Sequence, residues 1–184
     1  DIRKRLGKVK REQVTAFLDR YADTPLAWQL RKRWLKLQVR RGHWQTFLDF
    51  YRPTSNITLQ CQQVRALLTT GNSHEAMHLA EALWLHGRSR PKACDRVFDH
   101  WIKAGNPSPA LAWKRIELAM EQGQLQLARY LRRYLPDDER RQLDHWLSLH
   151  RKPARIAREK ATAKPHPRRL QMQVHAIRRL ARQD

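Results

Sequence analysis

The sequence predicts an all-α protein built of stacked helical hairpins. Apolar residues recur three and four positions apart along most of the 184 residues, and no segment alternates apolar and polar residues between turn signals. The chain contains 7 Trp, only 6 Gly and 41% apolar residues, which indicates a packed protein rather than a disordered one. Short connections marked by Gly or Pro separate the periodic segments. Together these observations predict about ten helices.

The first predicted helix begins after Thr24. A Thr at the N-cap and Pro25 at the first helical position favour a helix start, and Gly42 favours its end. Helical spacing then assigns the faces of this helix. We expect an apolar face of Leu26, Leu30, Trp34 and Leu37, and a polar face of Lys32, Lys36 and Arg40.

Nine further helices are predicted after Gly42, each bounded by turn or capping residues. We expect them at residues 43–51, 56–70, 73–86, 91–104, 109–122, 124–135, 137–150, 154–163 and 168–183. The helix at 109–122 is apolar on most sides, with a narrow polar stripe of Lys114, Glu117 and Glu121 and with Arg115 as the exception. A helix of this kind has neighbours on more than one side.

Three of the glycines mark a weak internal repeat. When Gly42, Gly71 and Gly123 are aligned, apolar residues recur three and five positions before each and five and eight positions after each. Each unit reads as a helix–Gly–helix hairpin, which cannot bury its apolar faces alone. Stacked hairpins form an α-solenoid, and we expect residues 1–184 to be one such superhelical segment. An irregular helical bundle is the alternative.

The net charge of +21 is concentrated at the two ends of the chain. Such ends favour anionic partners such as nucleic acid, anionic lipid or an acidic polymer. No helix-turn-helix, zinc-finger or RNA-recognition signature accompanies the cations, so a solvated basic face is an equal alternative. The candidate polyanion or glycan contacts are Arg31, Arg33, Arg168, Arg169, Arg178 and Arg179.

One metal motif is present, at His74, Glu75 and His78. The spacing His-Glu-x-x-His is that of the zincin proteases, in which two His hold zinc and the Glu acts as a general base. Its position counts against zinc, because Asn72 and Glu75 resemble a capping box and would put His74 in the first turn of a helix. We interpret the match as fortuitous, and we expect no metal, no cofactor and no catalytic residue.

No uncharged stretch is long enough for a membrane-spanning helix. The longest segment without Asp, Glu, Lys or Arg runs from Pro53 to Val64 and is mostly polar. The nucleophile-elbow, P-loop and dinucleotide-binding patterns are absent. The oligomeric state is left open.

The run from Cys61 to Pro136 resembles the large periplasmic soluble lytic murein transglycosylases. The resemblance is carried by "LWLHGRSRPKACD", by the W-x-x-x-G that follows, and by R-I-x-L-A-M. Upstream "GHWQTFLDFY" matches more loosely and downstream "LARQD" also fits, while residues 137–170 match least.

This resemblance implies a fragment of a long α-superhelix. In that family a separate lysozyme-like domain cleaves peptidoglycan and leaves a 1,6-anhydromuramyl end, using a Glu followed by Ser near a G-L-M-Q segment. This chain has neither motif. The resemblance therefore implies a non-catalytic scaffold segment that positions the catalytic domain and helps to hold glycan strands, with peptidoglycan as its partner through the full-length enzyme. It also implies a Cys61–Cys94 disulfide and a periplasmic location.

The sequence allows three functions other than a scaffold. The charge alone allows a basic polyanion-binding or nucleic-acid-binding module, although nucleic acid is the less favoured partner. A helical protein-interaction module overlaps with the scaffold. A zinc hydrolase built on His74, Glu75 and His78 is the remaining alternative.

Overall fold

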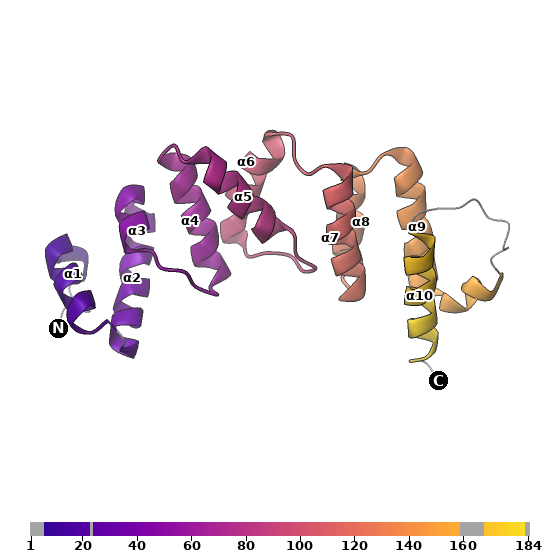
Figure 1. Ribbon diagram of the computed structural model, residues 1–184, viewed down its shortest axis with the longest axis horizontal. Helices are drawn as coiled ribbons and strands as arrows, with labels where there is room; N and C mark the ends of the chain where they lie inside the picture. Colours follow the sequence, from indigo (N-terminus) through magenta and orange to yellow (C-terminus); the bar gives the residue numbers. More distant parts are fainter. Residues whose placement is uncertain (1–5, 23, 159–167, 183–184) are drawn as a thin grey trace. The chain divides into compact units, whose positions relative to one another are not determined.

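The computed structural model describes residues 6–22, 24–158 and 168–182, and in these residues it contains α-helices, short 3₁₀ helices and no strand (Figure 1). The all-α prediction is confirmed. None of the helices in this part of the chain is long and apolar enough to cross a membrane. The chain divides into two compact units, residues 1–84 with 90–104 and residues 85–89 with 105–184, and each is described separately.

In the first unit each helix packs against the next one along the chain. The contacts run from α1 to α2 and onward in order to α6. Packing between sequence neighbours is the arrangement expected of stacked hairpins. The elements are η1 (Leu6–Lys8), α1 (Arg11–Arg20), α2 (Pro25–Arg41), α3 (Trp44–Phe50), α4 (Ile57–Thr69), α5 (Ser73–Trp84), η2 (Lys92–Cys94) and α6 (Asp95–Lys103).

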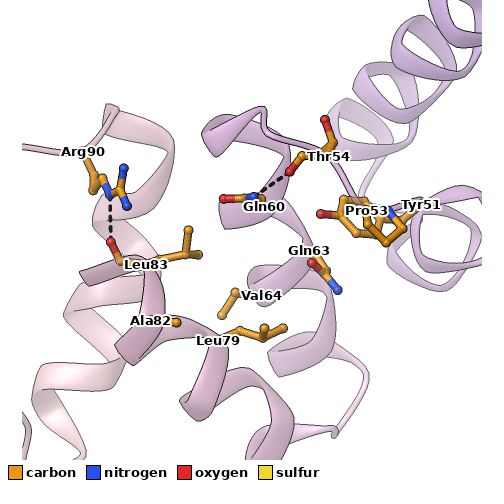
Figure 2. A pocket seen from close by; sticks show the side chains of 10 residues that line it. All are labelled: Tyr51, Pro53, Thr54, Gln60, Gln63, Val64, Leu79, Ala82, Leu83 and Arg90. Atoms are coloured by element: carbon orange, nitrogen blue, oxygen red, sulfur yellow. Dashed lines mark hydrogen bonds between the residues drawn. The ribbon is translucent and has the colours of Figure 1, made fainter. Parts of the chain in front are cut away.

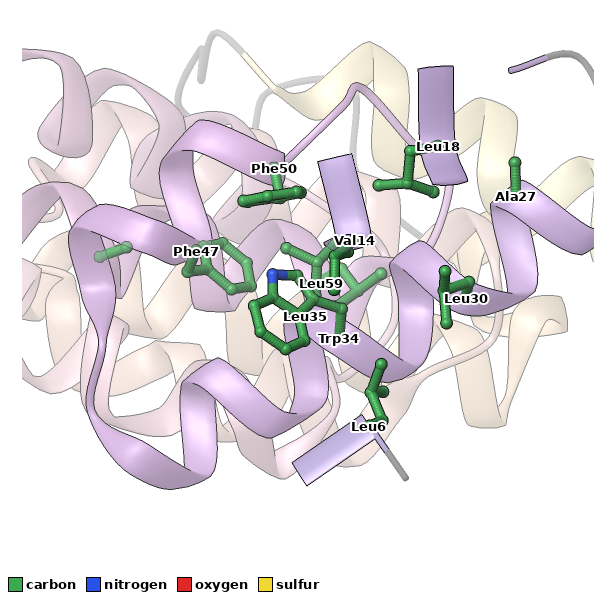
Figure 3. Close-up of a cluster of buried hydrophobic side chains, with 11 residues drawn as sticks. Leu6, Val14, Leu18, Ala27, Leu30, Trp34, Leu35, Phe47, Phe50 and Leu59 are labelled. Carbon is green, nitrogen blue, oxygen red and sulfur yellow. The ribbon is translucent and has the colours of Figure 1, made fainter. Parts of the chain in front are cut away.

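A cluster of aliphatic and aromatic side chains fills the beginning of this unit (Figure 3). Trp34 of α2 meets Phe50 of α3 edge-on, with ring centroids 5.8 Å apart. Trp84 and Trp101 make a second aromatic contact between α5 and α6, at 5.2 Å. Aromatic pairs of this kind bury a large apolar area and add a geometric preference.

The second unit pairs α7 with α8 and α9 with α10. Its aromatic centre is Trp113 of α7 stacked on Trp146 of α9, with centroids 6.3 Å apart. Arg115 is buried on α7, where its Nε–H donates to the carbonyl oxygen of His86 at 3.2 Å. The prediction that the helix at 109–122 has neighbours on more than one side is confirmed, since α7 packs against α8 and its Trp113 stacks on α9. The elements are α7 (Pro109–Glu121), α8 (Leu125–Leu131), η3 (Arg132–Tyr134), α9 (Asp137–Arg151), η4 (Pro153–Arg158) and α10 (Arg169–Leu180).

The three aligned glycines end their helices in the same way. Gly42, Gly71 and Gly123 have φ values of 72°, 88° and 68°, in the left-handed region that glycine occupies without strain. In each turn the residue after the Gly donates its N–H to the carbonyl four residues before the Gly, which is the Schellman pattern. The three bonds are His43 to Gln38 at 3.0 Å, Asn72 to Leu67 at 2.9 Å and Gln124 to Ala119 at 2.8 Å.

Some predicted elements differ from the structure. Helix α1 was not predicted, because Lys10 precedes it in place of a Ser, Thr, Asp or Asn cap. The prediction that Leu26 lies on the buried face of its helix is wrong. Leu26 is 43% exposed, because the buried face of α2 starts one residue later, at Ala27. The predicted helix at 154–163 is a 3₁₀ helix up to Arg158, and residues 159–163 and 183 lie outside the described residues.

Candidate polyanion-binding site

Three cations occupy successive turns of one helix. The hydroxyl of Thr24 accepts the N–H of Ala27 at 3.3 Å, which fixes where α2 begins. From that start, Lys32, Lys36 and Arg40 follow one another at intervals of four residues. Four residues of helix rise about 6 Å, so the three side chains form a short column along α2.

This column borders a hollow of about 510 Å³ between α2 and α4. Asn56 Oδ1 caps α4 by accepting the N–H of Leu59 at 3.0 Å, and this places the first turns of α4 opposite the column. Every charged side chain that lines the hollow is a cation. The lining consists of Lys32, Lys36, Val39, Arg40, Asn56, Thr58, Leu59 and Gln62.

An exposed tryptophan lies at one end of the column. Trp28 is one helical turn before Lys32 and is 53% exposed. The Lys32 Nζ lies 4.9 Å from the centroid of the Trp28 ring, within the range of a cation–π contact. An aromatic face, three cations and neutral polar groups are therefore close together on one side of the first unit.

The arginines predicted for α2 lie elsewhere on that helix. Arg31 is half-buried, and desolvation by burial, followed by the nearby charge of Arg52, lowers its pKa. Arg33 is exposed. Neither lines the hollow. Lys32 and Lys36 were predicted only as part of a polar face, and the spacing of four was the signal that could have singled them out.

The predicted cations of the second unit have several roles. Arg168 lies over the Trp113 ring at 4.5 Å and within 3.8 Å of Glu117, so it is engaged in packing. Arg169 begins α10. Arg178 and Arg179 line a hollow of about 990 Å³ together with Arg182.

Two histidines meet inside this second hollow. His150 Nδ1 of α9 and His175 Nε2 of α10 are 2.9 Å apart, and the Nε–H of Arg179 donates to the His150 carbonyl at 2.9 Å. Burial, followed by the charges of His150 and of Arg179, Arg178 and Arg182, lowers the pKa of His175 to about 4. Burial and Arg179 also lower the pKa of His150. Sequence reasoning did not find this pair, because 25 residues separate its members.

The zincin-like residues lie on the outer side of α5. His74, Glu75 and His78 are all exposed, and the two imidazole rings contact one another with centroids 4.7 Å apart. No group of three or more metal-ligating side chains occurs within the ranges that the structure describes.

A disulfide joins Cys61 of α4 to Cys94 of η2, and both residues are fully buried. In the same unit α4 and α5 line a smaller pocket of about 410 Å³, whose apolar side chains include Val64, Leu79 and Leu83 (Figure 2). The Nε–H of Arg90 donates to the Leu83 carbonyl at 2.8 Å at one side of this pocket.

The chain is similar in sequence to enzymes named soluble lytic murein transglycosylase. It is 33% identical to the one from Escherichia coli K12 over 172 residues, which are 93% of this chain. It is 34% identical to the one from Salmonella typhimurium over 124 residues, 67% of this chain. No family model matches the chain.

The structure is similar to parts of solved lytic transglycosylases. It superimposes on the 70 kDa soluble lytic transglycosylase SLT70 of Escherichia coli with a TM-score of 0.77 at 31% identity. It superimposes on an inactive mutant of lytic transglycosylase Slt from Pseudomonas aeruginosa with a TM-score of 0.80 at 33% identity. In both cases all of this chain is covered. It spans 30% of each solved chain and 27% of the Escherichia coli K12 relative.

Proposed function

We propose that this chain, a homologue of a segment of the soluble lytic murein transglycosylases, is a non-catalytic helical scaffold within a periplasmic peptidoglycan-cleaving enzyme. The observation that carries the proposal is the match over 93% of this chain to only 27% of a relative named for murein cleavage. A separate catalytic domain then performs the reaction that yields 1,6-anhydromuramyl ends.

The residues of the chain support a scaffold rather than a catalyst. None of its seven Glu is followed by Ser, and it contains no G-L-M-Q segment. Its buried aromatic contacts and repeated turns hold helices in a fixed order, as a stacked array requires. The Cys61–Cys94 bridge suits an oxidising compartment such as the periplasm.

Two measurements test the proposal. Incubation of the chain with purified murein sacculi should release no anhydromuropeptides, whereas the complete gene product should release them. Sequencing of the gene beyond Asp184 should reveal a lysozyme-like domain with a Glu-Ser pair and a G-L-M-Q segment. Release of anhydromuropeptides by the chain itself would contradict a scaffold role.

A second candidate is a polyanion-binding module, and the column of Lys32, Lys36 and Arg40 favours it. If phosphate contacts dominated, binding to a DNA or RNA oligonucleotide would weaken steeply between about 50 and 200 mM salt. A gel-shift titration at both salt concentrations measures this. An absence of binding at low salt would remove the candidate.

A further inference from the structure

We infer that the hollow between α2 and α4 binds a carboxylate-bearing glycan, with Trp28 against a sugar ring and Lys32, Lys36 and Arg40 against the carboxylates. The inference rests on the proposed function, because murein, whose stem peptides carry carboxylates, is the polymer named for the relatives. It adds a binding site to a segment that we propose to be non-catalytic.

The charges at the hollow favour an extended anion. Lys32, Lys36 and Arg40 border it from three successive turns, and no acidic side chain lines it. Each of these cations alone, half-buried at Lys32 and exposed at Lys36 and Arg40, binds a carboxylate weakly, since water screens the pair. Once one carboxylate of a polymer is bound, the next is held nearby at a high effective concentration. A polymer with repeated carboxylates therefore binds where a single carboxylate does not.

The neutral lining favours a sugar over a nucleic acid. Asn56, Thr58 and Gln62 offer amide and hydroxyl groups to the hydroxyls and amides of a glycan. Gln62 Oε1 is buried and has no hydrogen-bond partner among the described residues, which leaves an acceptor at the wall of the hollow. Sites for single-stranded nucleic acid stack successive bases on several aromatic side chains. The lining of the hollow contains no aromatic side chain, and the proposed site uses one, Trp28, which lies next to the lining beside Lys32.

Trp28 completes the glycan site. A sugar ring presents an apolar face of C–H groups, and the flat surface of an exposed indole suits it. Trp28 is 53% exposed although it is large and apolar, and the adjacent Lys32 Nζ lies over its ring at 4.9 Å. A ring stacked on Trp28 would therefore place an attached carboxylate within reach of the column.

Co-sedimentation of the chain with insoluble murein sacculi at about 50 mM salt tests the inference. We expect the double variant Lys32→Gln/Lys36→Gln to bind about tenfold more weakly, by loss of two charge contacts to the polymer. Trp28→Ala should weaken binding as well. Arg33→Gln is the control for position, because it removes a cation from the same helix outside the hollow, and it should bind within about twofold of the unmodified chain. Circular dichroism should show unchanged helix content in all variants.

The ligand chemistry is tested with two further probes. Sacculi whose carboxyl groups have been amidated should bind the unmodified chain as weakly as intact sacculi bind the double variant. An oligothymidylate competitor should not displace the chain from sacculi. Equal losses in the double variant and the Arg33 control, unchanged binding to amidated sacculi, or displacement by oligothymidylate would each overturn the inference. The scaffold proposal would remain, because anhydromuropeptide release and the downstream gene sequence test it independently.

Discussion

Gly87 lies buried in the second unit, where a side chain has no room. A Cβ atom added to it would lie 2.5 Å from the carbonyl oxygen of Leu118, and a helix backbone cannot yield as a flexible side chain can. We expect Gly87→Ala to lower the free energy of unfolding by about 1–3 kcal/mol, the usual cost of overpacking. Urea denaturation followed by circular dichroism measures it. Gly7→Ala is the control, because its Cβ would meet only the Arg41 side chain at 3.5 Å, and an equal loss there would contradict the explanation.

The His150–His175 contact makes the second unit sensitive to acid. Folding lowers the pKa of His175 from 6.5 to about 4, so the unfolded chain takes up a proton first as the pH falls. The contribution of His175 to stability is therefore fully present above pH 6.5 and decreases as the pH falls toward 4. The melting temperature should drop between pH 7 and pH 5, and His175→Gln should reduce this drop. A drop of the same size in the variant would assign the acid sensitivity to other groups.

At the scale of elements, the disulfide ties α4 to the start of α6. Its cysteines are 33 residues apart, and closing a loop of that length contributes about 3–4 kcal/mol in the chain-entropy model. We expect the double variant Cys61→Ala/Cys94→Ala to lose stability of this order, with faster amide hydrogen exchange in α4, α5 and α6. Addition of a reductant should destabilise the unmodified chain but leave the double variant unchanged. A reductant effect on the double variant would show that the reagent acts elsewhere.

At the scale of the whole molecule, α10 exposes an apolar stripe that an isolated globular protein would normally bury. Leu170, Val174 and Ile177 are 72%, 37% and 56% exposed. In the longer protein that we propose, a further helical hairpin would cover them. We expect Leu170→Asp/Ile177→Asp to reduce self-association of this chain in analytical ultracentrifugation and to leave its helix content unchanged.

In the complete gene product the same double substitution should destabilise the helical array, since it would then bury two charges. Thermal unfolding of the complete protein with and without the substitutions measures this. No change in either protein would mean that the stripe is solvent-exposed in both.

The sequence by itself determined the fold class, most helix boundaries and the relationship to lytic transglycosylases. These depend on local signals: helical periodicity, the Thr24 cap, and glycines such as Gly42 that take the left-handed conformation. Such signals act within one or two turns, so they can be read along the chain. The resemblance supplied the Cys61–Cys94 pairing, which local signals leave open.

Only the tertiary structure decided which polar groups share a site. Lys36 and Gln62 line one hollow although all of α3 lies between them in sequence, and the carbonyl that Arg115 meets belongs to His86, 29 residues earlier. The sequence predicted Arg31 and Arg33 from charge density, which carries no direction, and the structure places neither of them in the lining of this hollow. Which side of a helix faces a neighbour follows from the packing of apolar side chains between helices, and that packing joins residues far apart in the chain.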